Sequence, residues 1–240
     1  MIGRIAVSAK GLVKRYGRHR ALDGFSLDVP AGCVLGLVGP NGAGKTTWML
    51  AVAGLLRLEA GSVGLFGTGR PFDASIHSGR LAILPQDSEL PLEATAEGFL
   101  FDLARLQGLS SESARASVRE VLSAVNLADR AKNAIRSLSH GMRKRLMAAQ
   151  CYLGSPELVL LDEPMNGLDP EESVRFRQLI LSRKGTCTTV VSSHRLDDLE
   201  KLCTHIAFVR EGRLMRFATL DELLSEGGSL EESYLRGLKI

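Results

Sequence analysis

The chain has 240 residues, which is enough to bury a sizeable core and suits one large domain, with or without a subdomain. With 45% hydrophobic and 24% charged residues, its composition is ordinary for a soluble globular protein. Its thirty basic and twenty-seven acidic residues are interspersed, so the net charge of +3 does not argue for a nucleic-acid partner, and we expect none.

The sequence shows no segment suited to export or to membrane insertion. The apolar stretch between Arg4 and Lys10 is too short for a signal-peptide core, and no uncharged apolar run approaches the roughly 18 residues of a spanning helix. Any membrane contact would then go through a partner. The cysteines are far apart and lack CxxC spacing, which favours buried free thiols in a reducing cytoplasm over disulfides or a zinc site. They are Cys33, Cys151, Cys187 and Cys203.

The first half of the chain predicts strands, then a helix, then a longer helical region. Residues 5–29 read as antiparallel strands and turns, because short alternating segments are broken by glycines. Residues 33–38 form a nearly continuous apolar run, typical of a strand covered on both faces. A helix should follow from about 45 to 56. Helical spacing then runs throughout 95–126.

The second half alternates buried strands with helices, which predicts a mostly parallel core sheet. The strand candidates are 158–161, 188–192 and 206–209. We therefore predict a single α/β domain over 1–240, with an antiparallel β part and an inserted helical subdomain. Its parts are a body (5–86 and 156–224), a helical subdomain (87–155) and a carboxyl-terminal tail (225–240), which we expect to be a small regulatory helix.

A glycine-rich segment after the first buried strand matches the phosphate-binding pattern G-x-x-x-x-G-K-[ST] in full, in the strand-to-helix context that the pattern requires. Backbone N–H groups of such a loop hold phosphates, Lys45 reaches the outer phosphates, and Thr46 can bind Mg²⁺. A chance match would occur in on the order of one per cent of chains this long. With the next residue included, the predicted nucleotide-binding set is Gly39, Pro40, Asn41, Gly42, Ala43, Gly44, Lys45, Thr46 and Thr47.

Two carboxylates follow the predicted strand 158–161, at the edge where an open α/β sheet binds its ligand. Asp162 would hold Mg²⁺ through water, and Glu163 is placed to polarise the attacking water as general base. An Asp-Glu pair by itself would be a pair of solvated loop acids roughly four times in five. Beside a complete phosphate loop, the functional interpretation is favoured.

With these motifs, the order of the remaining ones resembles the ATP-binding-cassette (ABC) ATPases over about 11–224. The resemblance implies that Tyr16 stacks on adenine, where the alternative is a strand-edge core tyrosine. It also implies that Gln86 is the lid glutamine, which reaches the metal and the water and senses the transport partner. Without the resemblance, Gln86 would be an ordinary loop residue.

Residues 138–142 resemble the cassette signature, whose serine and glycine, here Ser139 and Gly141, bind the γ-phosphate from the opposite subunit. This implies that two chains share each ATP. The basic run 143–145 would add positive potential, although a solvated basic helix face is the favoured alternative.

Two further matches complete the set. Residues 167–170, which include Asp169 of the predicted nucleotide-binding set, match the loop along the dimer seam. His194 matches the histidine that contacts the γ-phosphate and orders Glu163 and the water, whereas a lone histidine there would usually be structural.

Three residues depart from the usual family pattern. His140 stands where the commonest signature has glycine, Met142 where it often has glutamine, and Met165 where threonine is usual. The clamp on the γ-phosphate could therefore be weaker or differently shaped. Similar signatures occur in bacterial exporters of drugs, lipids or polysaccharides, which favours export over import.

The resemblance implies an ATPase that uses ATP and Mg²⁺, dimerises as a homodimer or heterodimer, and powers a separate integral membrane permease. Its place would be cytoplasmic, peripheral on the inner face of the cell membrane. The alternatives are a soluble ATPase acting on a non-membrane target and a non-hydrolysing ATP-binding regulatory module. One cassette and no sustained heptads argue against the first, and the complete catalytic set argues against the second.

Overall fold

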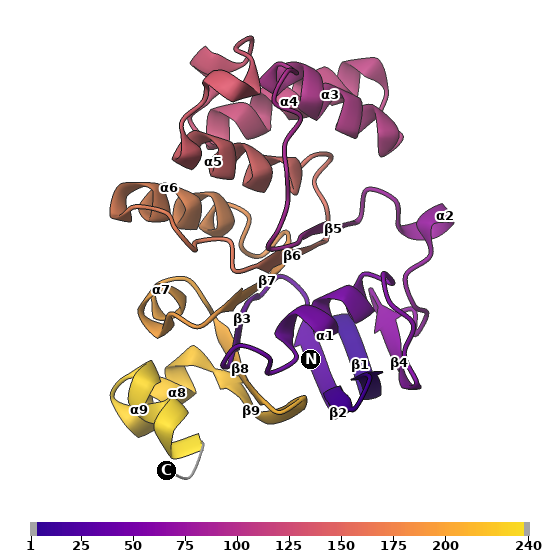
Figure 1. Cartoon of the computed structure of the whole chain (residues 1–240), viewed down its shortest axis with the longest axis vertical. Coiled ribbons are helices and arrows are strands. Elements are labelled where there is room, and N and C mark those ends of the chain that lie inside the picture. The colour runs from indigo at the N-terminus through magenta and orange to yellow at the C-terminus, as the bar shows by residue number, and fades with distance from the viewer. Residues whose placement is uncertain (1–3, 238–240) are drawn as a thin grey trace.

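The computed structural model describes residues 4–237, and two β-sheets form its framework (Figure 1). The smaller sheet is antiparallel with strand order β2-β1-β4, which confirms the antiparallel strands predicted for the amino-terminal part. Its strands are β1 (Ile5–Tyr16), β2 (His19–Pro30) and β4 (Ala60–Leu65).

The larger sheet has six strands in the order β5-β6-β7-β3-β8-β9. Its pairs are parallel except for the last, in which β9 runs antiparallel to β8, so the predicted mostly parallel core sheet is confirmed. Every residue of β3, β6 and β7 is buried, as expected for strands covered on both faces. The strands are β3 (Val34–Val38), β5 (Leu81–Leu84), β6 (Leu158–Asp162), β7 (Thr188–Ser193), β8 (His205–Arg210) and β9 (Arg213–Thr219).

Helix α1 (Lys45–Val52) packs between the two sheets. Trp48 and Met49 are fully buried there, in a core shared with strands of both sheets. Successive residues of a strand point to opposite faces, so Leu158 joins this core while Val159 joins a second core on the other face. The parallel register places Val38 beside Ser193, and Asp162 beside Ser192. The chain segments that follow β3, β6 and β7 therefore begin at the same edge of the sheet, where these three strands end.

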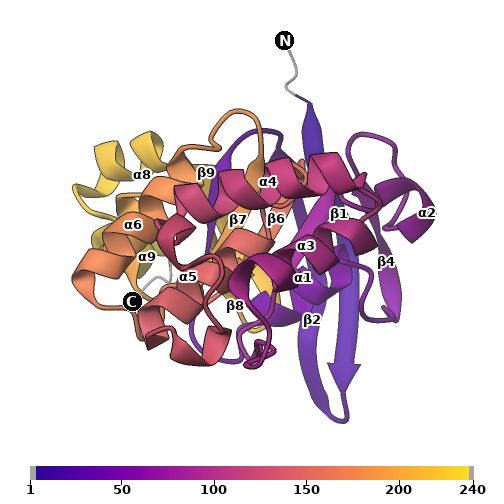
Figure 2. The same ribbon diagram turned by 90° about the horizontal axis from the view of Figure 1, so that it is seen from above.

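The second core extends into a helical layer that lies above the large sheet in Figure 1 and spreads across it in Figure 2. Each of its three main helices begins at a capping side chain, from Thr95, Ser110 and Ser139 respectively. The helices are α3 (Ala96–Leu106), α4 (Ser111–Ala124) and α5 (His140–Gln150), with short α2 (Ala74–His77) before them and the 3₁₀ turns η1 (Ala128–Arg130) and η2 (Ile135–Ser137) between α4 and α5.

One predicted helix was wrong in extent. It ends at Val52 rather than 56, because Gly54 adopts φ +70°, a left-handed conformation that ends a helix. The stretch 95–126 is mostly helical, as predicted, and is divided into α3 and α4: Gly108 has φ +92°, and Ser110 starts a new helix. The predicted strands agree with β3, β6, β7 and β8 to within one residue, whereas β4, β5 and β9 were not predicted.

In the part of the chain that the structure describes, four helices follow β6. Helix α9 packs onto the large sheet, since Leu230 is fully buried and the rings of Tyr234 and Phe208 lie 5.3 Å apart. The boundary proposed at 225 falls inside α8, and the division into body, helical subdomain and tail stays a prediction. The helices are α6 (Pro170–Leu181), α7 (Leu196–Glu200), α8 (Leu220–Gly227) and α9 (Leu230–Gly237).

The four cysteines are buried and unpaired, as predicted. Burial raises the pKa of Cys33 and of Cys151 to about 12. Across residues 4–237, none of the helices combines the length and apolar character needed to cross a bilayer.

Candidate active site

The loop between β3 and α1 is shaped by close backbone contacts that only glycine permits. A Cβ at Gly39 would lie 2.2 Å from the carbonyl oxygen of Val209. One at Gly44 would lie 2.3 Å from the carbonyl oxygen of Ala21, and Gly44 also has φ +106°. Helix α1 has no side-chain N-cap, so the N–H groups of its first turn are free to bind an anion. The loop therefore presents N–H groups where phosphates would bind.

Lys45 is held in place by the same loop. Its Nζ donates to the carbonyl oxygens of Gly39 at 2.7 Å and Pro40 at 3.1 Å, and the residue is 6% exposed. Burial lowers the pKa of Lys45, while the carboxylates of Glu163 and Asp162 act in the opposite direction. The loop thus holds an ammonium group ready to exchange these carbonyl contacts for phosphate oxygens.

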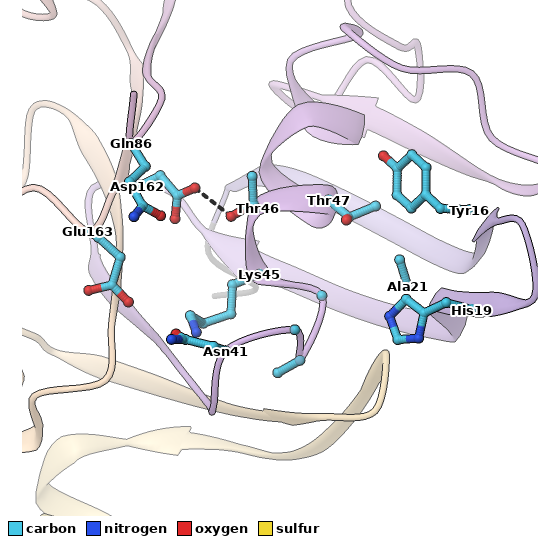
Figure 3. Close-up of a pocket in the computed structure, with 13 residues that line it drawn as sticks. Tyr16, His19, Ala21, Asn41, Lys45, Thr46, Thr47, Gln86, Asp162 and Glu163 are labelled. Carbon is cyan, nitrogen blue, oxygen red and sulfur yellow. Dashed lines mark hydrogen bonds between the residues drawn. The ribbon is translucent and has the colours of Figure 1, made fainter. Parts of the chain in front are cut away.

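Thr46 and Asp162 come from neighbouring elements and meet at the end of the sheet. The Thr46 hydroxyl donates to Asp162 Oδ2 at 2.5 Å (Figure 3). The other carboxylate oxygen of Asp162 accepts from the hydroxyl of Ser192, which in turn accepts from the N–H of Glu163 at 2.8 Å. Ser192 thus fixes both carboxylate-bearing residues, a role that the sequence analysis missed because it depends on the pairing of β6 with β7.

Glu163 faces His194. The Nδ1 of His194 lies 3.2 Å from both carboxylate oxygens of Glu163, whose side chain is only 9% exposed. Glu163 also has φ +48°, a strained backbone conformation for a residue with a side chain, and such strain concentrates at functional sites. This pair can orient a water molecule and accept its proton.

Lys45, Thr46, Asp162 and Glu163 line one pocket, with Glu163, Asp162 and Gln86 on one side of Lys45 (Figure 3). Tyr16 lies toward the other end with His19, which the sequence analysis did not select although it follows Tyr16 in the same hairpin. Tyr16 is 51% exposed, so the alternative of a core tyrosine was wrong. The pocket is lined by Tyr16, His19, Ala21, Asn41, Gly42, Ala43, Gly44, Lys45, Thr46, Thr47, Gln86, Asp162 and Glu163.

The pocket could hold Mg²⁺ together with phosphates. Within residues 4–237 no group of three His, Cys, Asp or Glu side chains could bind a metal by itself. The Thr46 hydroxyl and the Asp162 carboxylate do supply adjacent oxygen donors, and Gln86 lines the same pocket. Mg²⁺ prefers such oxygen ligands, and it commonly takes one or two carboxylates plus substrate phosphates and water. The donor set therefore fits Mg²⁺ brought in with a nucleotide.

Six predicted site residues do not line this pocket. Gly39 and Pro40 belong to the same loop and contact Lys45, and His194 contacts Glu163. The other three, Ser139, Gly141 and Asp169, belong to other elements. Ser139 is exposed and caps α5 by accepting from the N–H of Met142 at 3.2 Å. Gly141 follows in the first turn of α5. Asp169 caps α6 by accepting from the N–H of Glu172 at 2.8 Å. The chain therefore presents two groups of predicted site residues at separate places.

The basic run in α5 is not a solvated helix face, so that alternative was wrong. The side chain of Arg145 is 3% exposed and pairs with Glu172, 2.5 Å from Nε to Oε2. The Nζ of Lys144 donates to the carbonyl oxygen of Asn166, and Arg143 donates to the carbonyl oxygen of Arg136 at 2.6 Å. Each of the three cations is used for a specific contact.

Comparisons with known proteins agree with this site. The family described as "ABC transporter" matches residues 22–166. The chain is 37% identical over 224 residues to the "Daunorubicin resistance ATP-binding protein DrrA3" of Streptomyces coeruleorubidus, covering 93% of this chain and 71% of the relative. It is 34% identical over 211 residues to the "Nod factor export ATP-binding protein I" of Burkholderia orbicola, covering 86% and 68%.

A solved structure described as the ATP binding subunit of an ABC transporter superposes with a TM-score of 0.84 at 26% identity, covering 97% of this chain and 99% of the other. The cassette predicted from the order of motifs is thus confirmed at the level of family and fold.

Proposed function

The chain belongs to the ABC transporter family, and from this premise we propose that it is the ATP-hydrolysing subunit of an exporter, powering a separate membrane permease. Membership of this family implies that the chain binds ATP, couples ATP hydrolysis to transport and associates with a permease. Relatives named for drug resistance and for Nod factor export support the direction of transport. The observation that carries the proposal is the single pocket that brings Lys45, Thr46, Asp162 and Glu163 together.

We assign each residue of the pocket one task. Tyr16 offers a flat, half-exposed ring for stacking on adenine. The loop 39–47 and Lys45 bind the phosphates, and the positive potential at the start of α1 assists. Thr46, Asp162 and Gln86 would hold Mg²⁺, which when bound neutralises phosphate charge. Glu163 takes the proton from the attacking water, and His194 orients Glu163.

The site is completed by a second subunit, which we propose to be another copy of this chain. Ser139, Gly141 and Asp169 lie outside the pocket of their own chain. At the start of α5, Ser139 and the N–H groups of the first turn form a second place suited to a γ-phosphate. Two copies, each closing its signature segment over the ATP held by the other, would bury two ATP molecules. The dimer would act at the inner face of the membrane, where cytoplasmic ATP is available.

Replacing Glu163 tests the chemistry. Glu163→Gln should retain ATP binding but lower Mg²⁺-dependent turnover by about 10²- to 10⁴-fold, the contribution of a general base. It should also trap an ATP-bound dimer, visible by size-exclusion chromatography. Glu171→Gln is the matched control, because Glu171 is an exposed acid of α6. Full turnover in Glu163→Gln would remove the general base from this account.

Co-purification tests the partner. The tagged chain, expressed in its own host, should bring down a polytopic membrane protein in stoichiometric amount from detergent-solubilised membranes, identified by mass spectrometry. Recovery only in the soluble fraction, together with ribosomes or DNA, would leave the ATPase intact and reject the transport role.

A further inference from the structure

His194 lies in a short connection between two elements. Only residues 194–195 separate the end of β7 from the start of α7. The side chain of His194 is 50% exposed, and its imidazole contacts Glu163. A side chain with that much exposure is held little by packing, so the imidazole reaches Glu163 only when its backbone is in the right place. Because the connection is short, the position of α7 decides where that backbone lies.

Helix α7 depends on its neighbours for its position. It has five residues and no side-chain N-cap, and a helix that short is not stable by itself. Leu199 is fully buried, and a Cβ on Gly36 of β3 would lie 3.3 Å from its Cδ1, so α7 packs directly on the large sheet. Glu200 accepts a hydrogen bond from the N–H of Leu230 at 3.1 Å, which joins α7 to α9 (Figure 1). A further attachment, to α6, is made by Asp198.

Asp198 pairs with two cations from different elements. Its Oδ1 accepts from the guanidinium of Arg177 in α6 at 3.0 Å, and its Oδ2 lies 3.1 Å from Nε of Arg195, the residue after His194. The side chain of Asp198 is only 8% exposed. A carboxylate taken that far out of water needs a paired charge, and here two guanidiniums supply it. One carboxylate therefore attaches the residue beside His194 to both α6 and α7.

Stability alone explains this arrangement poorly. Desolvation offsets much of the attraction in a buried ion pair, and apolar side chains of similar volume often do as well. Apolar side chains could therefore join α6 to α7. They could not hold the half-exposed guanidinium of Arg195. The contact that requires a charge is thus the one with the residue beside His194.

We propose that Asp198 is a positioning residue for His194. Through Arg195 and Arg177 it fixes the connection between β7 and α7, so that the imidazole faces Glu163. This inference rests on the proposed function, in which His194 orients Glu163 toward the attacking water. Asp198 does not line the pocket, so its effect on turnover reaches the site through His194.

A double-mutant cycle with His194 tests this route, using single turnover of radiolabelled ATP with Mg²⁺ over hours so that slow variants remain measurable. Asp198→Asn keeps the size of the side chain and removes its charge. It should lower turnover at saturating ATP by about 10-fold, as the loss of an outer-shell partner does. In the His194→Ala background the same substitution should change turnover by less than about 2-fold, because residues that act through one group are not additive. Binding of a fluorescent ATP analogue to the monomer should not change on Asp198→Asn.

Substitutions of Arg195 separate positioning from stability, because they leave the pair of Arg177 and Asp198 intact. Arg195→Gln should lower turnover as Asp198→Asn does, with little change in melting temperature, since the Arg195 side chain is half exposed. Arg195→Lys keeps a cation near Asp198 and should retain most of the turnover. Asp197→Asn is the matched control, because Asp197 is the neighbouring exposed acid in the first turn of α7. It should leave turnover unchanged.

Three outcomes would overturn the inference while leaving the proposed function intact. The first is an equal fall in turnover on Asp198→Asn with and without His194, which would show that Asp198 acts by another route. The second is full turnover in Asp198→Asn or Arg195→Gln. The third is Arg195→Lys turnover as low as that of Arg195→Gln. A wild type without any Mg²⁺-dependent turnover, alone or with its permease, would reject the proposed function and the inference with it.

Discussion

The two halves of the proposed site differ in how far a single chain completes them. The phosphate half is built within the body: Lys45 already contacts the loop carbonyls, Thr46 contacts Asp162, and Glu163 faces His194. The signature half is a helix start on a different layer, where Ser139 caps α5 and is exposed. One half is organised before ATP arrives, and the other needs a second chain to give it a ligand. Binding and hydrolysis should therefore respond differently to substitutions in each half.

The largest effect is expected in the phosphate half. Lys45→Ala should lower ATP turnover by about 10²- to 10³-fold, as does the loss of one charge-stabilising donor in other active sites, and should weaken ATP binding by the monomer. Lys10→Ala is the control, because Lys10 forms an exposed ion pair with Asp28 and does not line the pocket. Equal effects of the two substitutions would show that the phosphate half has been wrongly located.

A substitution in the signature half should separate binding from turnover. Ser139→Ala should leave monomer binding unchanged but lower turnover by about 10- to 100-fold, the effect of losing one hydrogen bond to a charged group. It also removes the cap of α5, which costs about 1 kcal/mol. Ser110→Ala removes the equivalent cap from α4 and controls for that cost. If Ser110→Ala lowered turnover as much, Ser139 would be only a helix cap.

Replacing Ser192 should have a smaller effect on ATP turnover. Removing its hydroxyl leaves one oxygen of Asp162 and the N–H of Glu163 without their partner. Outer-shell partners of this kind change metal affinity or activity by about 10-fold or more. Ser192→Ala should therefore raise the Mg²⁺ concentration needed for half-maximal turnover, compared with Ser193→Ala, whose hydroxyl bonds only the N–H of Arg195 within this network. An unchanged Mg²⁺ requirement would remove Ser192 from the site.

The sequence predicted the parts of the site that are contiguous in the chain. A buried strand running into the glycine loop and α1, and another delivering Asp162 and Glu163, are local patterns whose physical roles are known. Contacts that depend on packing between distant segments of the chain could not be predicted from the sequence. The bond from Ser192 to Asp162 depends on the register of β6 and β7, and the basic run looked solvated because nothing local to it shows that α6 covers Arg145.

Helix lengths were less predictable than strands for a related reason. Residues 95–126 keep an apolar spacing that a continuous helix would share, yet Gly108 and the Ser110 cap divide it. Breaking the helix loses backbone hydrogen bonds. Packing of α3 and α4 on the same core, a tertiary effect, offsets that loss of stability.

The central claim is that the signature segment of one chain closes over the phosphate loop of another, and cross-linking tests it most directly. Asn41→Cys places a thiol on the exposed loop and His140→Cys places one in the exposed signature segment. The native cysteines should stay silent because all four are buried.

In the double variant carrying Glu163→Gln as well, a short bismaleimide should give a covalent dimer on a denaturing gel with Mg²⁺ and ATP, and little without nucleotide. Mixing the two single variants, one of them with a size tag, should yield a mixed dimer. Cross-linking confined within one chain, or unaffected by ATP, would contradict the account.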